Sequence, residues 1–202
     1  MKPVVAVVNF FIFLLLAIMV HMSISDPIDK MILLWVEEKR TSFGNAIFKT
    51  MSTIGSIKVL LPLAVVSGLV ALLYKKFLDA LFIMLVFWGS RELNHLLKLV
   101  FHRERPFFHR LFGESGYSFP SGHAMNSTIF LGFLYYATTR SFRLSQFQKR
   151  CVQVVLYGMI GLIACSRVYA GVHYPTDIVA GICGGVVILS GIIYIHQRVL
   201  HQ

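Results

Sequence analysis

The chain has 202 residues, of which 56% are hydrophobic and 14% are charged, and its mean hydropathy is +0.72. Because ordinary soluble domains are about 45–50% apolar, this composition excludes a typical soluble protein and favours one embedded in a membrane. The net charge of +10 would suggest a nucleic-acid partner in a soluble protein, but here basic residues flank long uncharged stretches, as in membrane topology. We therefore expect a single integral membrane domain, residues 1–202, with no nucleic-acid partner.

Uncharged apolar runs dominate the chain. Two of them are 18 residues long, 3–20 and 178–195, and three are 16 residues long, 59–74, 124–139 and 151–166. A membrane-spanning helix needs about 20 such residues. The sequence therefore predicts an all-α protein with six transmembrane helices, at 3–22, 52–74, 79–101, 121–139, 151–168 and 176–196.

The first of these helices has one feature of a signal peptide, because Lys2 supplies a positive start. Its apolar run is longer than usual for a signal peptide, and no Ala-x-Ala cleavage site follows it before Ser23. We expect it to be retained as a membrane helix.

Residues 26–55, between the first two predicted membrane helices, have a different character. Asp26 and Pro27 are typical of a helix start. Apolar residues then recur at helical spacing, first as Ile28, Met31, Ile32 and Trp35, and again as Phe43, Ile47, Met51 and Ile54. This pattern predicts one or two amphipathic helices in the membrane interface, serving either as a lid for a lipid substrate or as a plain connector anchored by Trp35.

Basic residues indicate the orientation. With six spans, one side of the membrane receives Lys2, Lys75, Lys76, Arg140, Arg143, Lys149, Arg150 and Arg198. The positive-inside rule makes that side cytoplasmic, together with both chain termini. The other side also carries Lys and Arg, several of them inside the polar motifs.

Three polar blocks lie at the ends of predicted helices: KLVFHRERP at 98–106, PSGH at 120–123 and SRVYAGVHYPTD at 166–177. Because the chain alternates direction, all the helix ends that carry these blocks fall on one membrane side. We therefore expect the blocks to form one site.

The charges in these blocks favour an anionic ligand. Lys98, Arg105 and Arg167 would repel a metal ion, whereas guanidinium and ammonium groups suit phosphate oxygens. Ser121 and Gly122 stand where a helix begins, and the free N–H groups of a helix start bind anions.

The imidazoles supply the chemistry that a phosphate ester requires. His123 is placed to protonate the leaving oxygen as a general acid. Asp177 follows His173 by four residues and is expected to orient it as a nucleophile that forms a phosphohistidine. The nearby cations should lower the pKa of His173 and keep it neutral. We interpret the other imidazoles, including His102, His109 and His196, as interfacial residues.

Together the blocks resemble the signature of the type-2 phosphatidic acid phosphatase superfamily, K-x6-R-P, P-S-G-H and S-R-x5-H-x3-D. The match comprises eleven residues in the required order and spacing over the motif core 98–177: Lys98, Arg105, Pro106, Pro120, Ser121, Gly122, His123, Ser166, Arg167, His173 and Asp177. The six-helix layout extends the resemblance over nearly the whole chain.

The resemblance implies that His173 is the nucleophile, Asp177 its partner and His123 the acid. It implies that five residues hold the phosphate: Lys98, Arg105, Ser121, Gly122 and Arg167. It also implies a metal-independent enzyme without a cofactor or obligatory protein partner, whose membrane-lipid substrate is cleaved on the extracytoplasmic side of a bacterial cytoplasmic membrane.

Within the family, the short form is similar to enzymes that convert phosphatidylglycerophosphate to phosphatidylglycerol, and alternatively to undecaprenyl pyrophosphate phosphatases. Gly122 favours the first group, because several members of the second carry Asp at this position. A non-enzymatic transporter or scaffold is the alternative from a different class. The sequence lacks clear repeats and midplane polar residues, which are typical of transporters.

Overall fold

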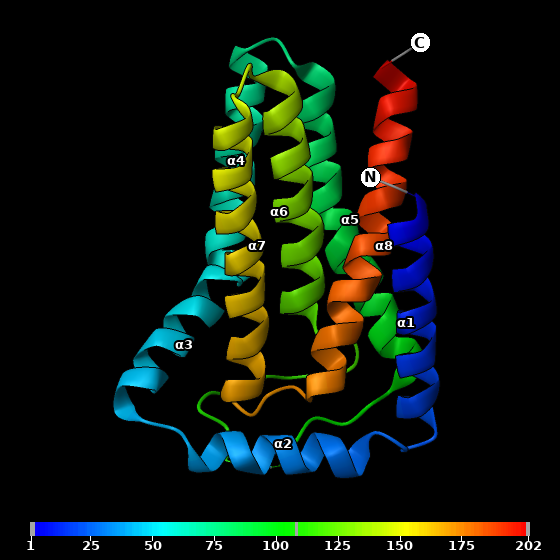
Figure 1. Cartoon of the computed structure of the whole chain (residues 1–202), viewed down its shortest axis with the longest axis vertical. Helices are drawn as coiled ribbons and strands as arrows, with labels where there is room; N and C mark the ends of the chain where they lie inside the picture. The colour runs from blue at the N-terminus through cyan, green and yellow to red at the C-terminus, as the bar shows by residue number, and fades with distance from the viewer. Residues whose placement is uncertain (1–2, 108, 201–202) are drawn as a thin grey trace.

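The computed structural model describes residues 3–107 and 109–200, and within those ranges it contains eight α-helices and no strand. The helices are α1 (Pro3–His21), α2 (Asp26–Glu38), α3 (Ser42–Ile54), α4 (Ile57–Leu73), α5 (Phe77–Phe101), α6 (Gly122–Ser141), α7 (Gln146–Tyr169) and α8 (Pro175–Leu200). The longer helices run roughly alongside one another, α2 lies across one end of them, and α3 slants from α2 towards α4 (Figure 1). The predicted all-α class is confirmed.

The second predicted membrane helix, 52–74, is wrong at its start. Residues 52–54 belong to α3, and α4 begins only at Ile57, with a bend of 43° between the two helices. The break falls at Gly55 and Ser56, where Ser56 is extended (φ −84°, ψ 166°). A Cβ at Gly55 would overlap Ile163 of α7, so glycine permits a close approach of the two segments.

Three helices, α1, α7 and α8, are each long and apolar enough to cross a bilayer, and the bent pair α3–α4 would make a fourth. Of the remaining long helices, α5 carries the charges of Arg91 and Lys98, and α6 carries polar residues at 126–128. The expected count of six spans therefore stays a prediction. Lys2, which entered the topology prediction, lies outside the described residues.

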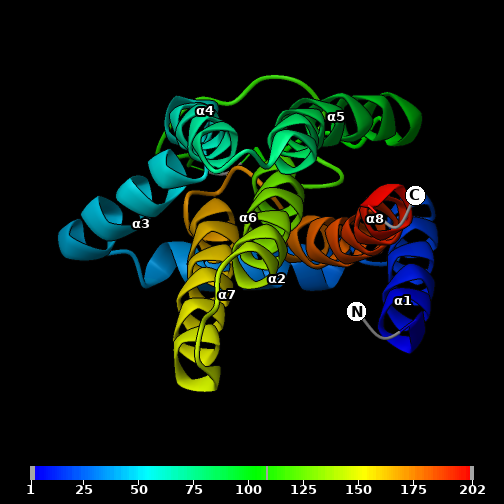
Figure 2. The ribbon, with the colours of Figure 1, turned by 90° about the horizontal axis from the view of Figure 1, so that it is seen from above.

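Helix α6 lies between α5, α7 and α8 (Figure 2). Its residues 124–133 are almost all buried, which explains why its hydropathy is modest: neighbouring helices surround it, so polar side chains there avoid lipid. Phe130 packs edge-to-face on Phe87 of α5, and Phe133 stacks on Phe82. These aromatic contacts form the centre of the main apolar core.

The end of α5, the start of α6, the end of α7 and the start of α8 lie at one end of the bundle, above α2 (Figure 1). Backbone contacts tie these segments together, since the amide of Ser121 donates to the carbonyl of Asp177 at 3.0 Å and that of Ser118 donates to Arg103 at 2.7 Å. The predicted convergence of the three polar blocks is thus confirmed. Helix α1 begins and α8 ends towards the opposite end.

The segment 26–55 forms two amphipathic helices, α2 and α3, as predicted. In α2, the apolar side chains Met31 and Trp35 are mostly exposed, whereas Asp29 and Leu33 are buried against the bundle. Asp29 accepts hydrogen bonds from the backbone amide of Thr176 at 3.1 Å and from its hydroxyl at 2.5 Å. Helix α2 is therefore more than a connector anchored by Trp35, because its inner face is bonded to the start of α8.

Candidate active site

His173 lies in the short turn between α7 and α8. The turn forms because Gly171 adopts a left-handed conformation (φ +71°) and Pro175 opens α8. The backbone amide of His173 bonds back to the carbonyl of Arg167 at 3.3 Å, and the imidazole is only 1% exposed. Its Nδ1 lies 3.3 Å from Oδ2 of Asp177, so the structure brings the expected pair within hydrogen-bonding distance.

Arg105 faces the other nitrogen of the same ring, with Nη1 3.1 Å from His173 Nε2. A guanidinium only donates, so Nε2 must accept and the ring proton resides on Nδ1, directed at Asp177. Arg105 is itself fixed by backbone carbonyls, at 2.9 Å from Gly116 and 2.8 Å from Val172. This arrangement selects the tautomer in which Nε2 carries the lone pair, which accepts from Arg105.

The carboxylate of Asp177 is fully buried and has several partners besides His173. Its Oδ2 accepts from the hydroxyl of Ser118 and from the amide of Tyr174 at 2.9 Å. Its Oδ1 accepts from Nη1 of Arg103 at 2.7 Å. Because each oxygen is held from a different direction, the carboxylate cannot rotate freely, and neither can the imidazole that it contacts.

Arg103 connects this pair to α2. Its Nη2 lies 2.7 Å from Asp29 and 3.0 Å from Asp26, and its guanidinium stacks 4.1 Å from the centre of the Tyr174 ring. Burial lowers the pKa of Arg103, but the attraction of Asp177 and Asp29 outweighs it and raises the pKa above its usual value. The side chain is therefore a permanent cation that joins α2, the end of α5 and the start of α8.

Arg167 is 1% exposed and lies on the last turns of α7. Its Nη1 donates to Ser52 of α3, and its Nη2 donates to Glu114. The second carboxylate oxygen of Glu114 lies 3.9 Å from Nη2 of Arg105, so this acid bridges two of the three expected phosphate-binding cations. Nε of Arg167 is buried with no hydrogen-bond partner within the described ranges.

The start of α6 supplies the other expected phosphate ligands. Ser121 is the N-cap residue, and its buried hydroxyl has no partner in the described part of the chain. A Cβ at Gly122 would lie 2.7 Å from Oδ1 of Asn94, whose amide holds the carbonyl of Pro120 at 3.2 Å, so glycine suits this close approach. His123 follows in the first turn and is half-buried.

The electrostatic setting favours a neutral His173. Burial lowers the pKa of His173 well below its usual value, and the positive charges of Arg105, Arg167 and Lys98 lower it further. The direction agrees with the expectation from the sequence. Within 3–107 and 109–200 no group of three or more His, Cys, Asp or Glu side chains is arranged to hold a metal ion.

Several residues at the site were not expected from the sequence: Ser52, Ser118, Arg103 and Glu114. Arg103 stands inside the first polar block, and charged residues next to membrane helices are often functional, so that signal was available. Ser52 and Glu114 come from segments whose position only the fold determines.

The interpretation of His196 as an interfacial residue is wrong. Its side chain is fully buried, with Nε2 2.9 Å from Asp79 and Nδ1 3.1 Å from the hydroxyl of Tyr136. The imidazole lies in a polar cluster between helices at the other end of the bundle. By contrast, His102 and His109 are exposed, as expected.

Comparisons with known proteins agree with this geometry. Residues 69–200 match the family model of the PAP2 superfamily. Phosphatidylglycerophosphatase B of Bacillus subtilis (strain 168) is 33% identical over 179 residues, which cover 89% of this chain and 88% of that protein.

Two solved structures are similar to the chain. The crystal structure of the first transmembrane PAP2 type phosphatidylglycerolphosphate phosphatase from Bacillus subtilis has a TM-score of 0.90 and 31% identity, over 96% of both chains. LpxE of Aquifex aeolicus has a TM-score of 0.65 and 23% identity over 81% of this chain and 93% of that one, and shares the fold.

Proposed function

Because the chain belongs to the PAP2 superfamily and is a membrane lipid phosphatase of that family, we propose that it hydrolyses phosphatidylglycerophosphate to phosphatidylglycerol through a phosphohistidine at His173. The observation that carries the proposal is the burial of His173 between Asp177 and Arg105, in one fixed tautomer. In this proposal residues 1–202 work as one phosphatase domain.

In the first step, Nε2 of His173 attacks the phosphorus atom. An N–P bond forms, the bond from phosphorus to the lipid oxygen breaks, and His123 gives its proton to that oxygen. Asp177 accepts the Nδ1–H bond throughout and stabilises the positive charge that develops on the ring. The lipid alcohol then leaves.

In the second step, His123 accepts a proton from a water molecule, whose oxygen attacks the phosphorus atom. The N–P bond breaks, inorganic phosphate is released, and His173 returns to its neutral form. His123 thus ends the cycle with the proton that it lost in the first step, so the sequence needs no other reactant than water.

The unsatisfied donors support the assignment of the phosphate site. Buried polar groups are nearly always hydrogen-bonded, so a buried hydroxyl of Ser121 and a buried Nε of Arg167 without partners are two places where a ligand oxygen would complete the bonding. With Arg105, Lys98 and the amide of Gly122 they would surround a phosphoryl group.

Glu114 contacts two of the same cations, Arg167 and Arg105. Its carboxylate bonds to Arg167 and approaches Arg105, so an arriving phosphate has to displace it. The acid is 29% exposed and comes from the connection between α5 and α6, which favours such a movement.

Arg103 is proposed as a positioning residue. It contacts Asp177 and would not touch the phosphate, so it acts by holding the carboxylate that holds His173. Asp29 in turn holds Arg103. In this proposal α2 has a role beside that of a lid, because it would align the catalytic pair from outside the bundle.

The remaining parts of the proposal rest on charge and on family. The cations Lys98, Arg105 and Arg167 disfavour a catalytic metal ion, which supports metal independence. Basic residues flank the helices at the opposite end of the bundle, and several of those at the site end belong to the polar motifs. The flanking residues support a cytoplasmic placement of the opposite end and an extracytoplasmic site. Family membership favours an enzyme over a transporter or scaffold. Undecaprenyl pyrophosphate remains the alternative substrate.

The test is phosphate release by the purified protein in detergent with EDTA present. Phosphatidylglycerophosphate and undecaprenyl pyrophosphate are compared, with His173→Ala as the inactive variant and His95→Ala, an exposed imidazole on α5, as the matched control. We expect faster release from phosphatidylglycerophosphate, lost only in His173→Ala. Faster release from undecaprenyl pyrophosphate would replace the substrate, and release that persists in His173→Ala would refute the nucleophile.

A further inference from the structure

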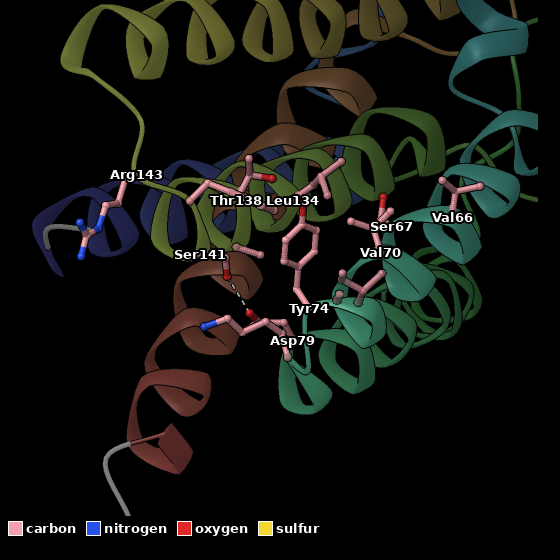
Figure 3. Close-up of a pocket in the computed structure, with 14 residues that line it drawn as sticks. Val66, Ser67, Val70, Tyr74, Asp79, Leu134, Thr138, Ser141 and Arg143 are labelled. Carbon is pink, nitrogen blue, oxygen red and sulfur yellow. Dashed lines mark hydrogen bonds between the residues drawn. The ribbon is translucent and has the colours of Figure 1, made fainter.

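A cavity in the described part of the chain lies away from the candidate active site. It has a volume of about 330 Å³ and opens between α4, α5 and α6 at the opposite end of the bundle. Figure 3 shows Val66, Ser67 and Val70 of α4 facing Leu134 and Thr138 of α6 across it. A volume of this size falls in the range of about 300–1,000 Å³ that is typical of small-molecule sites.

The walls of this cavity are apolar and accessible from the bilayer side. Val66 is 56% exposed and Tyr74 is 61% exposed, so the groove between α4 and α6 is open at the outer surface of the bundle. Tyr74 packs edge-to-face against Phe142 at 5.3 Å, and both rings line the cavity. This shape and lining suit an acyl chain.

Cations surround the polar end of the cavity. Lys76 and Arg143 line it, and a second cavity of about 250 Å³ shares Lys76 and adds Lys75 and Arg140. The acid in this region is Asp79, which already accepts from the hydroxyl of Ser141 at 2.9 Å (Figure 3) and from Arg140 at 3.4 Å.

The other cations remain available for a ligand. Across residues 3–107 and 109–200, neither Lys75 nor Lys76 nor Arg143 forms an ion pair. Four cations and one carboxylate therefore meet here, and the excess positive charge is complementary to an anionic headgroup.

Two hydroxyl groups on the cavity wall are also available. Thr139 is not one of them, because its hydroxyl donates to the carbonyl of Tyr135 at 2.8 Å, as membrane-helix threonines commonly do. Its neighbour Thr138 and Ser67 of α4 both line the cavity, and in the described ranges neither side chain has a protein partner. Both are placed to bond to an ester or phosphate oxygen.

We propose that an anionic glycerophospholipid binds at this end, with an acyl chain between α4 and α6 and its phosphate at Lys76 and Arg143. The lipid is a bound ligand and not a substrate, because the catalytic imidazoles His123 and His173 lie at the other end of the bundle. The proposal is independent of the proposed function. A basic helix end alone would attract anionic lipids without a specific place, so the test must separate the cavity from the surface charge.

The experiment measures lipid binding to the purified protein in neutral detergent by native mass spectrometry. Phosphatidylserine serves as the anionic probe, because it is neither the proposed substrate nor the proposed product, and phosphatidylcholine serves as the zwitterionic probe. The cavity variant is Lys76→Gln with Arg143→Gln. The matched control is Lys149→Gln with Arg150→Gln, which removes the same charges at the same end of the bundle but outside both cavities.

We expect one phosphatidylserine to bind in preference to phosphatidylcholine, with affinity reduced about tenfold or more in the cavity variant and by less than about twofold in the control. Equal losses in both variants, or no loss in either, would overturn the proposal. Photoactivatable phosphatidylserine on the wild-type protein provides a measurement that needs no variant. Crosslinks within 66–76 and 134–143 are expected, and crosslinks confined to other segments would contradict the site.

Discussion

Both ends of the helix bundle contain a buried histidine beside a buried aspartate, yet the two pairs have different surroundings. At one end His173 lies 3.3 Å from Asp177, and at the other His196 lies 2.9 Å from Asp79. Asp177 follows His173 by four residues, whereas Asp79 lies on a different helix from His196. The neighbours of each pair determine what the pair can do.

The difference lies in the group that faces the second nitrogen of each ring. Nδ1 of His196 faces the hydroxyl of Tyr136. Nε2 of His173 instead faces Arg105, near the unpaired donors of Ser121 and Arg167. The two His–Asp pairs therefore differ in what the second ring nitrogen faces, which is a guanidinium beside His173 and a phenol beside His196.

Removing each histidine in turn tests whether the two His–Asp pairs have different roles. We expect His173→Ala to lower kcat/KM by about 10⁴-fold or more. Catalytic residues that act as a unit lose nearly all of their rate enhancement when the nucleophile is removed. His196→Ala should instead lower the melting temperature and leave kcat/KM per folded protein within about threefold. Steady-state hydrolysis and thermal unfolding of both variants test this, and equal losses of activity would contradict it.

The cations can be compared in the same way. Arg167→Ala should lower kcat by about 10²–10³-fold, because it removes a buried donor to charge that develops on the phosphoryl group. Arg140→Ala, at the other end, removes a half-exposed partner of Asp79 and should leave kcat within about threefold. A near-wild-type rate for Arg167→Ala would remove it from the phosphate site.

Arg103→Met should lower kcat by about 10- to 100-fold with little change in KM, since the residue positions Asp177 and does not touch substrate. Without the positive charge of Arg103, Asp177 stabilises a protonated His173 more strongly, so the pKa of His173 should rise. The acidic limb of the kcat/KM profile should then move to higher pH. Asp29→Asn removes an anion that holds Arg103, so it should lower kcat by a smaller factor without moving the limb to higher pH. An unshifted limb in Arg103→Met would show that Arg103 is only structural.

The pH profile of the wild-type protein follows from the lowered pKa of His173. The neutral ring is the reactive form, so activity is lost only when the pH falls below that pKa. The loss attributable to His173 should therefore appear below the usual histidine pKa of about 6.5. The measurement is kcat/KM between pH 4 and 8. The limb that belongs to His173 is identified because it shifts in Arg105→Gln. A His173 limb above about pH 6.5 would contradict the prediction.

The smallest expected effect concerns Glu114. Glu114→Gln removes the charge that competes for Arg167 and Arg105, so inorganic phosphate should inhibit more tightly, by about threefold, as suits a partly exposed ion pair. The inhibition constant for phosphate measures this. A weaker inhibition in the variant would mean that Glu114 helps to hold the anion.

Much of the site was predictable because its residues sit at fixed spacings beside helix ends, and the alternation of membrane helices brings those ends together. Asp177 follows His173 by four residues, so one helical turn suffices to pair them. The partners from distant segments were not predictable. Asp29 reaches Arg103 across 74 positions, and Ser52 reaches Arg167 across 115.

The fold was predicted to a similar extent. Long apolar runs specify helices, and each of the six predicted segments is helical, although 52–74 is broken after Ile54 and the count of six spans stays a prediction. The break at Gly55 and Ser56 was missed, although a Gly-Ser pair is a common place for a helix to kink. The burial of His196 was missed because its partner Asp79 lies on a different helix.

If His173 carries the phosphoryl group, rapid quenching of the protein with radiolabelled phosphatidylglycerophosphate should trap it. We expect an acid-labile, base-stable phosphoenzyme whose label maps to His173 and is absent in His173→Ala. Turnover with no labelled protein at any quench time, or label on His123, would contradict it.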